Sequence, residues 1–79
     1  MSRAEALKWI ANTFEESPER LTAETSRDSI PAWDSLGVLT LMAGLDQEFG
    51  LLLSDTELRP MKSVQDILDV LQKNGKLSD

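Results

Sequence analysis

Apolar side chains recur in this chain at the three- and four-residue spacing that places them on one face of a helix. The first such stretch opens with the capping-box pair Ser2 and Glu5. Its apolar face combines Leu7, Ile10, Ala11 and Phe14. Ser17-Pro18 should end it, because the residue before a proline avoids helical geometry. The pattern therefore predicts a helix over residues 3–16.

A long connection and a second helix come next. Residues 18–34 are rich in Thr, Ser, Asp and Pro, and we expect three apolar residues to pin them to the core: Leu21, Ile30 and Trp33. The second helix should run from Ser35 to Phe49 and stop at Gly50, which suits a left-handed C-cap. A capping-box pattern over residues 54–57 then starts a turn that Pro60 keeps short.

The last predicted helix is capped by Ser63 and Asp66 and closed by Asn74-Gly75. Its apolar stripe consists of Val64, Ile67, Leu68 and Leu71. Residues 76–79 should fray beyond it. Because strand signals are weak, the chain is predicted to be all-α. We expect one domain over residues 1–79, a small bundle of three to four helices with a long loop between the first and second helices.

The second predicted helix has two apolar faces where a bundle helix normally has one. We assign one face to the core: Val38, Leu41, Met42, Leu45 and Phe49. The opposite face carries Leu36, Leu39 and Ala43, beside Thr40 and Gln47. An exposed apolar strip of this kind indicates a docking surface, unless the long loop folds over it or the whole helix is buried.

Four other residues have two interpretations each. Trp9 lies opposite the apolar face of the first helix, where it packs under the long loop or contacts a partner. Trp33 anchors the loop, or contacts whatever approaches Ser35. Gly37 and Gly44 each lower helix propensity by about 1 kcal/mol, so they mark a close backbone approach or have no role.

Charge and composition exclude several classes of function. Eight basic against fourteen acidic residues give a net charge of −6, which argues against nucleic acid as a partner. Residues 34–69 hold seven acids against Arg59 and Lys62, a balance of −5 that either steers basic partners to this half or only keeps the protein soluble. Without Cys or His, neither a disulfide nor a zinc site with its usual ligands can form. The first residues lack an apolar leader and no run could span a bilayer, so we expect a cytoplasmic monomer that does not insert into membranes.

Ser35 is the strongest candidate for chemistry. It follows Asp34, a good N-cap, so its hydroxyl should lie at a helix entrance and point outward. No His is available to deprotonate it, and neither a phosphate loop nor a cluster of metal ligands is present. The sequence therefore predicts no catalytic residue and no metal site, and Ser35 is better interpreted as an acceptor of modification.

Asp34-Ser35-Leu36 resembles the attachment motif of acyl carrier proteins, in its Trp33-Asp34-Ser35-Leu36 variety. The likeness covers nearly the whole chain, including Leu21-Thr22, Glu48-Phe49-Gly50 and Ser63-Val64. It implies that a phosphopantetheinyl transferase moves 4′-phosphopantetheine from coenzyme A onto Ser35. Acyl intermediates of a fatty-acid, polyketide or other specialised pathway would then travel on the thiol of that arm.

The resemblance also makes the second helix the partner-recognition helix. Carried over by position, the contact candidates for acyl-loading and acyl-processing enzymes with basic patches are Asp34, Leu36, Leu39, Thr40, Ala43, Asp46 and Glu48. The common fatty-acid type has acids where this chain has Gly37 and Thr40, which indicates a specialised pathway. Acyl cargo would lie between the second and third helices, lined by residues that are otherwise ordinary core: Met42, Leu45, Leu58 and Met61.

Two alternatives remain open from the sequence. One keeps the carrier chemistry with an aminoacyl or peptidyl cargo, since the loading enzyme chooses the cargo. The other is an unmodified helical adaptor that binds a partner helix through Leu36 and Leu39. An enzyme acting alone is the least favoured interpretation.

Overall fold

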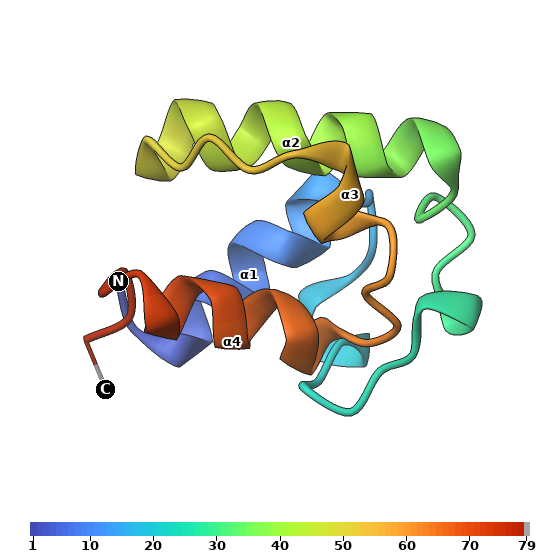
Figure 1. Cartoon of the computed structure of the whole chain (residues 1–79). Coiled ribbons are helices and arrows are strands. Elements are labelled where there is room, and N and C mark those ends of the chain that lie inside the picture. The colour runs from blue at the N-terminus through green and yellow to red at the C-terminus, as the bar shows by residue number, and fades with distance from the viewer. Residues whose placement is uncertain (79) are drawn as a thin grey trace.

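The structure is a computed structural model that describes residues 1–78, and these residues contain four α-helices and no strand (Figure 1). The helices are α1 (Arg3–Thr13), α2 (Ser35–Phe49), α3 (Asp55–Leu58) and α4 (Val64–Lys73). Two 3₁₀ turns, η1 (Pro18–Arg20) and η2 (Arg27–Ser29), lie in the long connection. The all-α prediction is confirmed, and α2 begins and ends at the predicted residues.

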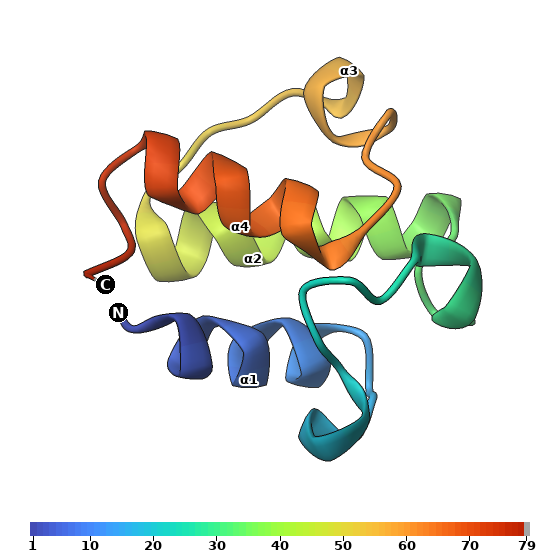
Figure 2. The same ribbon diagram turned by 90° about the horizontal axis from the view of Figure 1, so that it is seen from below.

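The three longer helices lie side by side, and α3 is a single turn beside α2 (Figures 1 and 2). Their facing sides bury one continuous core, whose largest fully buried side chains include Ile10, Phe14, Leu41, Leu45, Leu58, Ile67, Leu68 and Leu71. The N-terminus and the segment after α4, up to Ser78, lie at one end of the bundle, and α2 starts at the opposite end (Figure 1). The start of α2 is therefore remote from both segments.

The first helix is shorter than predicted. It ends at Thr13, because Glu15 adopts a left-handed conformation with φ 57°. The amides of Glu15 and Glu16 donate to the carbonyls of Asn12 and Ala11, 3.3 and 2.8 Å away, which is the Schellman pattern of a helix end. The predicted end at residue 16 is wrong, since the chain turns before Ser17-Pro18. At the other end the predicted capping box is confirmed, and the hydrogen bonds from Ser2 lower the pKa of Glu5.

The long connection is pinned as predicted. Leu21, Ile30 and Trp33 are all buried in the core. Its backbone also pairs with the segment before α4, through a single bridge between Ser26 and Ser63. The carbonyls of residues 25 and 23 accept from the first two amides of α4, at 3.0 and 2.9 Å. The connection therefore caps α4 and is held between two helices.

Two further expectations are wrong. Trp9 does not pack under the long loop but against α2, where its ring meets Phe49 edge-to-face with centroids 5.0 Å apart. Residues 76–78 are not free, because the Ser78 amide donates to the Met1 carbonyl at 2.8 Å and Leu77 packs on the core. Asp79, the last residue expected to fray, lies outside the described residues. No helix in residues 1–78 has the length and hydrophobicity that a bilayer span requires.

Candidate functional site

Ser35 is the first residue of α2, and its side chain is exposed. Asp34 has the extended backbone of an N-cap, and its carboxylate accepts from the Gly37 amide at 2.9 Å. The Ser35 hydroxyl makes no hydrogen bond with any described residue, so it stays available to an approaching molecule. The predicted position of this hydroxyl, outward at a helix entrance, is confirmed.

A tightly packed block behind Ser35 fixes the start of α2. The buried ring of Trp33 stacks on Phe14, with centroids 5.0 Å apart and planes 18° apart. Arg27 also contacts Trp33. Its Nε donates to the Trp33 carbonyl at 2.9 Å, and its guanidinium lies over the indole ring, 5.8 Å from the ring centroid. Trp33 is only 3% exposed, so it anchors the loop and is not itself a contact surface. The indole N–H has no acceptor among residues 1–78.

Gly37 and Gly44 both mark close approaches. A Cβ on Gly37 would lie 2.0 Å from the Ala32 carbonyl oxygen, so only glycine lets the loop backbone pass the first turn of α2. A Cβ on Gly44 would lie 2.9 Å from the Trp9 ring. Gly37 faces the backbone of Ala32, which confirms the predicted close backbone approach at this position. Gly44 instead faces an aromatic side chain, that of Trp9.

The outer face of α2 is open. Leu36 is 71% exposed and Leu39 is 54% exposed, and the long connection does not cover them. The other predicted contact residues of α2 are exposed as well: Thr40, Ala43, Asp46 and Glu48. The alternative of a wholly buried helix is therefore wrong.

An apolar groove of about 430 Å³ continues this face toward the segment that follows α2. It is lined by Leu39, Met42, Ala43, Asp46, Leu52, Leu53 and Ser54. Leu52 is 83% exposed, and sequence reasoning missed it. Three consecutive leucines at residues 51–53, too short for an element, were the available signal. We call Leu36, Leu39, Ala43 and Leu52 the apolar face.

No family model matches the chain, but individual proteins do. It is 34% identical over 59 residues to a Bdellovibrio bacteriovorus protein named acyl carrier protein, covering 75% of this chain and 76% of that protein. A protein of the same name from Thermosynechococcus vestitus is 34% identical over 87% of this chain and 83% of its own length. One from Coprothermobacter proteolyticus is 29% identical over 82% and 79%. The chain belongs to the acyl carrier protein family. This membership supports the role of a carrier protein.

The predicted cargo-lining residues of this carrier protein belong mostly to the core. Leu45 and Leu58 are fully buried and Met61 is 8% exposed, which supports the interpretation of ordinary core packing. Met42 is half-buried and opens into the groove on the outer side of α2. The four residues therefore do not line one common cavity of the carrier protein.

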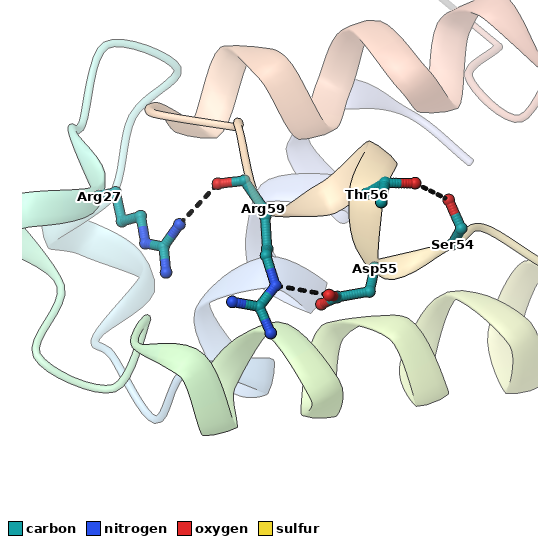
Figure 3. A network of polar contacts seen from close by, with 5 residues as sticks. All are labelled: Arg27, Ser54, Asp55, Thr56 and Arg59. Atoms are coloured by element: carbon teal, nitrogen blue, oxygen red, sulfur yellow. Dashed lines mark hydrogen bonds and ion pairs between the residues drawn. The ribbon is translucent and has the colours of Figure 1, made fainter.

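A second cleft of the carrier protein, of about 540 Å³, was not predicted. It lies between η2 and the turn after α3 and is lined by Arg27, Asp28, Arg59, Pro60, Met61 and Lys62. Figure 3 shows Arg27 reaching the Arg59 carbonyl across the two segments. We call it the basic cleft.

Proposed function

We propose that this acyl carrier protein is modified on Ser35 by a phosphopantetheinyl transferase. The Ser35 oxygen would form a bond to the phosphorus that carries pantetheine in coenzyme A. The bond from that phosphorus to the rest of the pyrophosphate breaks, adenosine 3′,5′-bisphosphate leaves, and the hydroxyl proton goes to a base on the transferase. The product is a phosphodiester, and the arm supplies a thiol that holds acyl groups as thioesters.

The single observation that carries this proposal is an exposed serine hydroxyl without a partner at the start of α2, in a chain of this family. Ser35 fits the group because no described side chain bonds or covers its oxygen. Asp34 occupies the Gly37 amide, while the amides of Ser35 and Leu36 have no acceptor among residues 1–78. Such amides at a helix start favour a phosphate. In this reaction the carrier protein exposes the Ser35 hydroxyl oxygen and fixes its position at the start of α2.

The surroundings of Ser35 also suit enzymes that must reach it in turn. The apolar face begins at Leu36, directly after the proposed attachment residue, and continues along α2 to the groove. Asp46 lines that groove, so a basic residue on a partner could pair with it there. Glu48 is exposed elsewhere on α2 and offers a partner a second carboxylate. We propose that transferase and acyl-processing enzymes dock there, through Leu36, Leu39, Thr40 and Ala43.

Intact-mass spectrometry tests the proposal. The purified protein is incubated with coenzyme A and a broad-specificity transferase, and we expect one phosphopantetheinyl group per chain. Ser35→Ala should stay folded, because the side chain is exposed, and should gain no mass. Ser78→Ala is the matched control, since Ser78 is also exposed but lies near the chain ends, and it should be modified normally. A wild-type chain that gains no mass would contradict the proposal.

A further inference from the structure

The basic cleft gathers an unusual share of the positive charge. The sequence holds eight Lys and Arg residues in total, and three of them, Arg27, Arg59 and Lys62, line this cleft. Three acids lie near them: Asp28 in the lining, Asp55 beside Arg59, and Asp66, whose carboxylate accepts from the Lys62 amide at 2.8 Å. The local charge balance is zero in a protein whose net charge is −6. An anion is therefore repelled less by this cleft than by the acidic surface around it.

Hydrogen bonds hold Arg27 and Arg59 in place, and of the three cations only Arg59 pairs with a carboxylate within residues 1–78. Arg27 donates from Nε to the Trp33 carbonyl and from Nη1 to the Arg59 carbonyl, at 2.9 and 3.0 Å, and both acceptors are neutral. Within residues 1–78 the ion pair is the one between Arg59 and Asp55 (Figure 3). The Lys62 ammonium makes no hydrogen bond or ion pair with a described residue. A positioned guanidinium with no carboxylate partner is suited to bind an oxyanion.

The cleft is also close to the proposed attachment residue. Its Arg27 wall is bonded to Trp33, which precedes Ser35 by two residues. Because successive Cα atoms are ~3.8 Å apart, those of Trp33 and Ser35 are separated by about 8 Å at most. Pro60 and Met61 add an apolar wall. The apolar wall could contact the hydrocarbon part of an acyl chain, and the cations could contact a negative charge at its end. The proposed arm on Ser35 would carry such a chain close to the cleft.

We propose that the basic cleft binds the terminal carboxylate of an acyl group carried on the Ser35 arm. The cargo class is then acyl chains with a carboxylate at the end remote from the thioester. This inference rests on the proposed function of Ser35. The apolar face lies on other residues and stays free for partner enzymes while the cargo is held.

The test compares two cargoes of equal length. A broad-specificity transferase loads the protein from hexanoyl-coenzyme A or from adipoyl-coenzyme A, and mass spectrometry verifies each product. Heteronuclear NMR then follows the Arg27 and Arg59 side-chain N–H signals and the amides of residues 59–62. We expect adipoyl to shift these signals and hexanoyl to leave them near their positions in the unacylated, arm-bearing protein. The adipoyl shifts should fall as salt is raised.

Charge-removing variants locate the effect. Lys62→Gln and Arg59→Gln should each reduce the adipoyl-dependent shifts at Arg27 by more than half. Lys73→Gln removes the same charge from an exposed position on α4 and should leave them unchanged. Arg27 itself is not substituted, because its bonds to Trp33 and Arg59 support the fold.

Four results would overturn the inference. Equal shifts with hexanoyl and adipoyl would show that the carboxylate is not recognised. Shifts already complete in the unacylated protein would assign the cleft to the phosphodiester of the arm. The same shifts in unmodified protein on titration with inorganic phosphate would make it a site for free anions. No shift with either cargo would remove the site. Failure of the transferase to modify Ser35 is detected earlier by mass, and would contradict the proposed function instead.

Discussion

The two flanks of α2 are both apolar but differ in burial: the inner flank packs into the core and the outer flank is exposed. On the inner flank Val38, Leu41 and Leu45 are fully buried and Gly37 has no room for a single added carbon. On the outer flank Leu36 and Leu39 are equally apolar yet more than half exposed. Burial stabilises the inner residues, whereas nothing within residues 1–78 covers the outer ones. One helix thus carries a side that is buried in the core and a side that the fold leaves exposed, where we propose that partner enzymes dock.

The largest expected effect contrasts two leucines on these flanks. Leu41→Ala should lower the free energy of unfolding by about 2–5 kcal/mol, because it leaves a cavity in a fully buried position. Leu39→Ala makes the same chemical change on the exposed flank and should cost within about 0.5 kcal/mol. Urea unfolding followed by circular dichroism measures both. Similar losses in the two variants would mean that the flanks do not differ as described.

A smaller effect is expected from adding one carbon to each helix glycine. Gly37→Ala forces a Cβ against the Ala32 carbonyl, which is backbone, so we expect a loss of about 2–3 kcal/mol. Gly44→Ala meets the end of the Trp9 ring, and part of its clash is offset by the ~1 kcal/mol gain in helix propensity. Thermal unfolding ranks the variants. If Gly44→Ala proves the more damaging, the start of α2 is less tightly held than its contacts indicate.

A negative charge introduced on the outer flank should weaken docking of the transferase more than it lowers the free energy of unfolding. Leu39→Asp places a carboxylate in the apolar face, and we expect kcat/KM of the transferase to fall about tenfold, which is ~1.4 kcal/mol. The free energy of unfolding should change by about 0.5 kcal/mol or less. Gln72→Asp adds the same charge at an exposed position of α4, away from the outer flank of α2, and is the matched control. Unfolding by Leu39→Asp would show that this flank is core.

Much of the fold was predictable because its signals are local. The N-cap Asp34 and the left-handed Gly50, with φ 66°, set the ends of α2, and both are evident in the sequence. The end of α1 was not evident in the sequence. Its left-handed residue is Glu15, and a glutamate, unlike a glycine, does not indicate a left-handed helix end. The place of Trp9 was mistaken although Gly44 offered a clue. Gly44 leaves room for the Trp9 ring of the neighbouring helix.

The candidate site also has parts that local sequence predicts and parts that it does not. Ser35, its cap and the α2 residues of the apolar face follow from one continuous stretch of sequence, so the pattern of that stretch predicts them, whereas Leu52 lies beyond it and was missed. The basic cleft joins Arg27 to residues 59–62, which the chain separates by 32 positions. They meet because Ser26 pairs with Ser63, and the Arg27 amide donates to the Lys62 carbonyl at 2.8 Å. No local pattern encodes that pairing, so only the folded chain shows the cleft.

The smallest expected effect concerns Glu15, the residue whose left-handed backbone ends α1. Its left-handed backbone costs a residue with a Cβ roughly 1 kcal/mol, and glycine avoids that cost. Glu15→Gly should therefore raise the free energy of unfolding by about 1 kcal/mol, measured by urea unfolding. Glu16→Gly removes the same charge from a position without positive φ, so it should be neutral or destabilising. If both variants gain stability equally, relief of acidic repulsion explains the gain, and the left-handed turn at Glu15 is not strained.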